Sequence, residues 1–166
     1  TLGTRGLFAI FLIYSGMRPE LSDDTFITFQ YVRTWYEHGI LNWHRDLPLV
    51  DGFTSVGHVL LLRSGMGLGL DIFTVNTVIC FGAFGCIWLL FLLATRGMAP
   101  IPRLLGLSVI ALHNGFVFWV GAGLDAVPYA ACFFAAYVAF DRAVRLQRFD
   151  VWTAVSIMAL AIMRPD

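Results

Sequence analysis

Charge is scarce in this sequence, and lysine is absent from it. Only 13% of the 166 residues are charged, and the 11 basic residues, all arginine, are balanced by 11 acidic ones. Soluble domains carry charge on roughly a quarter of their residues, so this composition excludes an ordinary soluble domain. The zero net charge also suggests neither a nucleic-acid partner nor a polybasic lipid-binding patch.

Cysteine is scarce as well, with three residues that all lie inside apolar runs. A thiol in that setting behaves as a small hydrophobe, so these cysteines indicate no redox compartment. What the sequence does contain is 58% hydrophobic residues in several long runs. We therefore predict an all-α, polytopic membrane helix bundle that forms one transmembrane domain.

Residues 1–17 are predicted to form the first helix. The apolar part, residues 6–17, is too short to cross a hydrocarbon core of about 30 Å at about 1.5 Å per residue. A signal-peptide core is the alternative, but no clear cleavage site follows and longer apolar segments do. We expect this segment to be a truncated first transmembrane helix. We also expect the chain to be the N-terminal part of a longer protein.

The segment 18–71 is predicted to lie outside the bilayer, on its surface. Ser22 is a good N-cap, and apolar residues recur three or four positions apart until Gly39, which is typical of an amphipathic helix. A polar loop follows over 42–52, and 56–70 is expected to form a second helix at or shallowly in the interface.

Four crossings are predicted after this segment. Residues 72–95 contain no charge and are long enough to span a bilayer with some tilt. The other expected crossings are 104–120, 126–140 and 151–166.

The distribution of charge predicts the orientation. With the N-terminus in the cytoplasm, six arginines and two aspartates lie inside, as the positive-inside rule requires, while nine acidic residues lie outside. The inner arginines are Arg5, Arg96, Arg103, Arg142, Arg145 and Arg148. The outer acids include Asp23, Asp24, Asp125 and Asp166, which are far apart in sequence, and such convergence is expected of a site assembled at one membrane face.

Asp23 and Asp24 are the main candidates for chemistry. Adjacent carboxylates near lipid can act as a general base, because partial desolvation and mutual repulsion raise the proton affinity of one of them. The alternative is that they complement the dipole of the helix N-terminus. A metal site is a weaker hypothesis: His38, His44, Asp46 and Asp51 share one loop but lack zinc-type spacing, and no metal or cofactor is indicated.

Five segments, in order along the chain, resemble the signature of a known family. These segments are Asp23-Asp24-Thr25-Phe26-Ile27 with the following aromatic helix, then Gly39 and Asn42, Asp51-Gly52-Phe53-Thr54-Ser55, Gly123-Leu124-Asp125, and Arg164-Pro165-Asp166. The family is the bacterial GT-C membrane glycosyltransferases that use polyprenyl-phosphate sugars, including the terminal arabinofuranosyltransferase of mycobacterial cell-wall synthesis. Asp stands for the family's Glu at 51, 125 and 166, and Gln30 stands for its Arg.

The resemblance implies an inverting glycosyltransferase in the bacterial plasma membrane, with its active site on the extracytoplasmic face. It would move a sugar, such as arabinofuranose, from a polyprenyl-phosphate donor to a cell-envelope glycan or glycolipid acceptor. Asp23 would be the base, and Asp24 would orient the acceptor or tune its neighbour. The residues expected to bind the substrate or donor are Arg33, Asp51, Thr54, His58, Arg63, Asp125, Arg164 and Asp166.

Two other classes of function stay open at this point. A polytopic transporter would place ionisable groups or broken helices near the bilayer midplane, and only His113 favours this. A non-catalytic membrane subunit is the third possibility. No nucleic-acid partner is expected.

Overall fold

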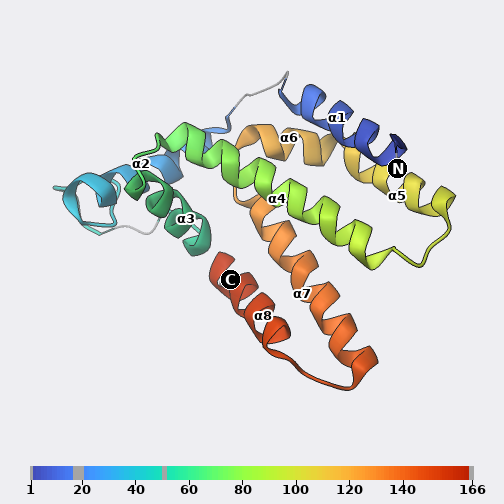
Figure 1. Ribbon diagram of the computed structural model, residues 1–166. Helices are drawn as coiled ribbons and strands as arrows, with labels where there is room; N and C mark the ends of the chain where they lie inside the picture. The colour runs from blue at the N-terminus through green and yellow to red at the C-terminus, as the bar shows by residue number, and fades with distance from the viewer. Residues whose placement is uncertain (1, 17–20, 50–51, 165–166) are drawn as a thin grey trace.

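The chain is all-α. The computed structural model describes residues 2–16, 21–49 and 52–164, and within these ranges the chain forms eight α-helices joined mostly by short loops (Figure 1). The helices are α1 (Leu2–Gly16), α2 (Asp23–His38), α3 (Val56–Gly67), α4 (Ile72–Ala94), α5 (Pro100–Leu112), α6 (Asn114–Ala122), α7 (Ala126–Leu146) and α8 (Val151–Met163).

The long helix α4 is the centre of the bundle. It packs against α7, which forms an antiparallel hairpin with α8, and against α6 and the N-terminal α1 (Figure 1). Phe84 of α4 is fully buried and stacks on Phe11 of α1, with ring centroids 3.5 Å apart. Trp88, Leu107 and Val127 bring α4, α5 and α7 into the same apolar core. Burying these large side chains accounts for most of the packing between helices.

Two described helices, α4 and α7, are long and apolar enough to cross a membrane. The pair α5 and α6 makes a third span if it is counted as one. These two to three candidate spans indicate a membrane protein. The shorter helices α1 and α8 have 15 and 13 residues, and α8 covers only part of the expected crossing 151–166.

The expected crossing 104–120 is broken rather than continuous. His113 has extended backbone dihedrals, so it ends α5 and begins α6, and the two helices bend by 46° there. Gly115 lies beside this break, where a Cβ would come 2.8 Å from the tip of the exposed His113 ring. Periodicity alone did not predict the break because the apolar pattern continues through it.

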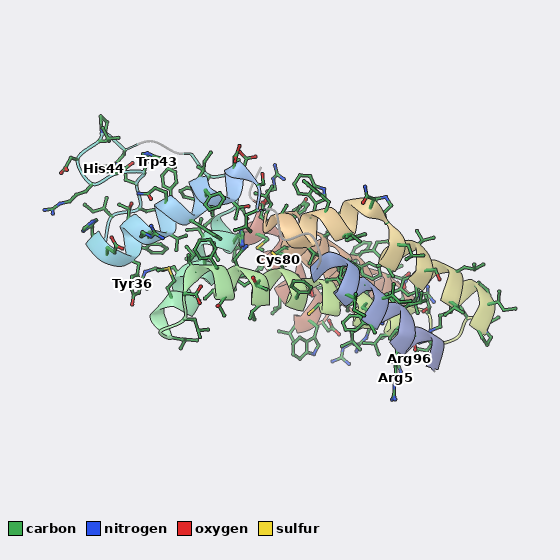
Figure 2. The ribbon with its side chains drawn as sticks, turned by 90° about the horizontal axis from the view of Figure 1, so that it is seen from above. Arg5, Tyr36, Trp43, His44, Cys80 and Arg96 are labelled. Atoms are coloured by element: carbon green, nitrogen blue, oxygen red, sulfur yellow. The ribbon has the colours of Figure 1, made fainter. Side chains whose placement is uncertain are left out.

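Helices α2 and α3 pack together at one end of the bundle. Phe29 and Val32 of α2 meet Val59 and Leu62 of α3 and Val75 of α4 in a second apolar cluster. Viewed from above, Tyr36, Trp43 and His44 lie at this end, and Arg5 and Arg96 lie at the opposite end (Figure 2). Arg5 and Arg96, which are far apart in sequence, therefore lie at the same end of the bundle.

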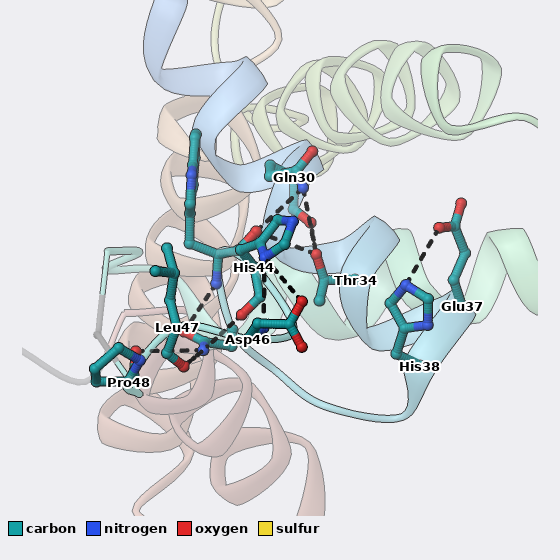
Figure 3. A network of polar contacts seen from close by, with 10 residues as sticks. Gln30, Thr34, Glu37, His38, His44, Asp46, Leu47 and Pro48 are labelled. Atoms are coloured by element: carbon teal, nitrogen blue, oxygen red, sulfur yellow. Dashed lines mark hydrogen bonds and ion pairs between the residues drawn. The ribbon is translucent and has the colours of Figure 1, made fainter.

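The loop after α2 is built around Asn42. Gly39 ends α2 in the left-handed conformation, with φ of 73°, as the sequence predicts. The buried Asn42 amide nitrogen then donates hydrogen bonds to the carbonyls of His44, Leu47 and Pro48 (Figure 3). Gln30, at the position where the resembled family has arginine, donates to the Trp43 carbonyl at 3.1 Å. This loop is therefore held to α2 by side chains that satisfy its backbone.

Candidate functional site

A polar cavity of about 350 Å³ lies where four distant parts of the chain meet. It is formed by the first turns of α2, the segment leading into α3, the turn between α6 and α7, and the residue after α8. We call it the site cavity. Its lining includes five of the candidate residues, Asp24, Thr54, His58, Asp125 and Arg164.

Hydrogen bonds to the last carbonyls of two helices bring these parts together. At one side of the cavity, the Ser22 amide and the Thr25 hydroxyl both donate to the carbonyl of Ala122, at 3.1 and 2.7 Å. At the other side, the Ser55 hydroxyl donates to the carbonyl of Met163 at 2.7 Å. The last carbonyls of a helix lack intrahelical partners, so these donors fasten the ends of α6 and α8 to the site.

Two glycines allow the close approach of these elements. A Cβ on Gly57 of α3 would lie 2.7 Å from the Cα of Met163, so only glycine lets α3 reach the end of α8. Gly123 has φ of 75°, and a Cβ there would overlap the amide nitrogen of Asn76. The tight turn at Gly123 sets Asp125 against α4.

A buried polar pair lies at the inner wall of the cavity. His58 and Asn76 are each only 2% exposed, and His58 Nε2 lies 3.0 Å from the Asn76 side-chain oxygen. Because an amide oxygen only accepts, Nε2 donates this bond, and the neutral ring leaves Nδ1 as an acceptor. Burial lowers the pKa of His58, and the Asn76 hydrogen bond and the charge of Asp125 oppose that shift. His58 is therefore neutral at pH 7.

Asp125 has one carboxylate oxygen, Oδ2, that is buried and makes no hydrogen bond to any described residue. A buried acceptor without a donor is costly, so such an atom calls for an explanation. Since Asp125 lines the site cavity, a hydroxyl of a bound molecule could supply the missing donor.

The lowered pKa of His58 predicts a dependence of stability on pH. The unfolded chain protonates His58 below its ordinary pKa of 6.5, whereas the folded chain resists protonation, so folding stability should fall as the pH drops below 6.5. We expect the thermal unfolding midpoint to decrease as the pH is lowered from about 7.5 to about 5.5. A series of thermal melts in detergent measures this change. His58→Asn should flatten this part of the profile, whereas the exposed control His44→Gln should keep it. An unchanged profile in His58→Asn would contradict the assignment.

A separate apolar hollow has Tyr129 in its wall. It has a volume of about 510 Å³, is almost entirely hydrocarbon, and lies between α4, α5, α6 and α7. Its lining residues are Ile87, Phe91, Ile110, Phe116, Tyr129, Ala130, Phe133 and Phe134. The guanidinium of Arg164, which lines the site cavity, lies 6.0 Å from the centre of the Tyr129 ring. Arg164 of the site cavity thus lies near Tyr129 in the wall of this hollow, which we call the apolar trough.

The structure places other candidate residues outside the site cavity. Asp23 is exposed and does not line the cavity, although its neighbour Asp24 does. Arg33 lines a separate polar hollow beside the Asn42 loop. The Arg63 guanidinium lies over the Tyr36 ring, with 4.6 Å to its centroid. Helical geometry explains the placement of Asp23, since side chains one residue apart point about 100° apart.

Asp51 and Asp166, which we also expected to bind substrate, lie outside the described residues. Within residues 2–16, 21–49 and 52–164, no three His, Cys, Asp or Glu side chains are grouped so that they could hold a metal ion.

Sequence reasoning missed Asn76, Ser55 and Tyr129. Asn76 had a recognisable signal, because it is a strongly polar side chain in a long charge-free helix, and polar groups in such helices usually have a partner or a role. Ser55 belongs to the resembling segment 51–55 but was not singled out, and Tyr129 had no signal, since both make their contacts with the end of α8, far along the chain.

In chemical terms, the site cavity offers two carboxylates, a neutral imidazole and a guanidinium, and the guanidinium lies near a residue of the apolar trough. No protein-family model, curated protein or solved structure matches this chain.

Proposed function

We propose that this protein is a membrane glycosyltransferase that takes its sugar from a polyprenyl-phosphate donor. One observation carries the proposal: Asp24 and Arg164 line a single cavity, and Arg164 also contacts the aromatic ring that borders the apolar trough. A base for the acceptor, a cation for the phosphate and a hydrocarbon surface for the lipid are the three features that this reaction requires.

In the proposed reaction, an acceptor hydroxyl oxygen attacks the anomeric carbon of the donor sugar. The new carbon–oxygen bond forms as the bond to the phosphate oxygen breaks, and the configuration inverts. The hydroxyl proton passes to the Asp24 carboxylate, and polyprenyl phosphate leaves with the bonding electrons. We assign the base to Asp24, in place of Asp23, because Asp24 lines the cavity.

Arg164 is proposed to stabilise the departing phosphate. A phosphate leaving group needs compensation of its charge rather than protonation, and a guanidinium supplies this through charge-assisted hydrogen bonds. The exposed Arg164 side chain lies at the end of α8, where the Ser55 hydrogen bond to Met163 holds the backbone. It is therefore a cation in a defined place that a phosphate can reach.

Asp125 and His58 are proposed to hold the sugar. Asp125 Oδ2 has no donor among the described residues, and the neutral His58 ring leaves Nδ1 able to accept. Sugars present many hydroxyl donors, so binding a sugar would satisfy Asp125 Oδ2, which is otherwise costly to bury. The resemblance favours arabinofuranose and the outer face of a bacterial plasma membrane as the finer assignment.

The test is a transfer assay in proteoliposomes with a labelled polyprenyl-phosphate sugar and a glycan acceptor. We expect release of polyprenyl phosphate together with labelled acceptor, and no transfer from the matching sugar phosphate that lacks a lipid. Ala130→Trp, which narrows the trough, should raise the donor KM about tenfold by displacing one or two methylenes of the tail. The control Ala159→Trp, on the exposed side of α8, should leave KM unchanged.

Two results would contradict the proposal. One is equal use of the lipid-free sugar phosphate, which would remove the role of the trough. The other is sugar movement across sealed proteoliposomes without any transfer to the acceptor, which would identify a transporter instead.

A further inference from the structure

A second hollow of mixed chemistry lies away from the site cavity, near the C-terminal ends of α4 and α7. Its volume is about 620 Å³, and part of its wall comes from α8. Leu90, Leu93 and Val138 give it apolar walls, and Arg96 and Arg145 are among its charged residues. We call it the arginine groove.

The groove lies at the level of a membrane interface. Both α4 and α7 are candidate membrane spans, and the groove is lined by Leu90, Leu93, Ala94 and Arg96 around the end of α4 and by residues from Ala135 to Leu146 along the second half of α7. Tyr137 also lines it and is 60% exposed. Tyrosine and arginine beside apolar residues at the end of a span are typical of the headgroup region.

The groove is positively charged although the whole chain is neutral. Arg96, Arg142 and Arg145 line it together with one acid, Asp141, and Asp150 lies 3.6 Å from Arg142. Arg145 pairs with Asp141 at 2.9 Å, but both side chains are substantially exposed. Exposed ion pairs are weak, so an anion can compete for these arginines. Arg96 is exposed, and its Nε donates to a backbone carbonyl rather than to a carboxylate.

We propose that the arginine groove binds an anionic glycerophospholipid. Its phosphate would lie between Arg96 and Arg145, and one acyl chain would follow the apolar wall between α4 and α7. A zwitterionic lipid carries its own cation and gains less from the three guanidiniums. The site is separate from the site cavity, and the proposal does not depend on the transferase function.

The experiment uses the whole chain in phosphatidylcholine nanodiscs that contain a minor fraction of phosphatidylglycerol. Native mass spectrometry of the released protein counts the retained lipids. We expect one phosphatidylglycerol to be retained preferentially over phosphatidylcholine. Retention should fall about fivefold for each of Arg96→Gln and Arg145→Gln, the expected effect of one arginine near a lipid phosphate. Arg45→Gln, an exposed arginine in the loop after α2, should not change retention.

A second pair of variants tests the acyl chain. Ala94→Trp fills the groove without changing its charge and should also reduce retention, whereas Ala9→Trp, exposed on α1, should not. Soluble glycerol 3-phosphate should fail to displace the lipid. The proposal is overturned if the two arginine variants retain the lipid fully, if Arg45→Gln loses as much as they do, or if glycerol 3-phosphate displaces it.

Discussion

Replacing Asp24 by Asn is expected to reduce kcat of sugar transfer by about 10²- to 10⁴-fold, the usual contribution of a general base. The amide keeps the size of the side chain but cannot accept the acceptor proton. Asp24 is exposed at the first turn of α2, so the change should leave the fold and the donor KM nearly unaltered. The measurement is a kinetic series in proteoliposomes, with lipid donor binding checked separately.

Asp23→Asn is the matched control for this prediction. It removes the same charge from the same helical turn, but Asp23 does not line the site cavity. If the two acids merely complement the helix dipole, both variants should behave alike and both should retain activity. A large loss in Asp23→Asn with little loss in Asp24→Asn would assign the base to the other carboxylate and contradict our placement.

Replacing Gly123 by Ala is expected to destabilise the fold by about 3 kcal/mol, combining left-handed backbone strain with overpacking. The added methyl would overlap the Asn76 amide, which is buried and lies within hydrogen-bonding distance of His58. Displacing Asn76 should also disturb the inner wall of the site cavity. Unfolding by heat or denaturant, followed by tryptophan fluorescence in detergent, measures the change in stability.

Gly39→Ala separates the two causes of this effect. Gly39 has nearly the same positive φ, 73°, but a Cβ there would meet nothing within 4 Å. It should therefore cost only the backbone strain, about 1 kcal/mol, and leave activity unchanged. Equal destabilisation by the two variants would show that the contact with Asn76 contributes nothing.

The local sequence pattern correctly predicted α4 and the C-terminal end of α2. The charge-free run 72–95 corresponds to α4, and the aromatic helix after Ser22 ends at Gly39, as a left-handed cap requires. Both are properties of neighbouring residues, namely apolar length and the conformational freedom of glycine. The break at His113 escaped prediction because it lies within an apolar pattern that continues on both sides.

The composition and the positions of the charged residues along the chain by themselves determined that this is an all-helical, membrane-type chain. They also identified the candidate acids and arginines. Only the tertiary structure decided which of these residues meet. Asp24, Asp125 and Arg164 share a cavity because Ser22, Thr25 and Ser55 fasten helix ends that are far apart in sequence. The orientation of Asp24 rather than Asp23 into the cavity, and the grouping of Arg96 with Arg145, depend in the same way on how helices pack, which local patterns do not encode.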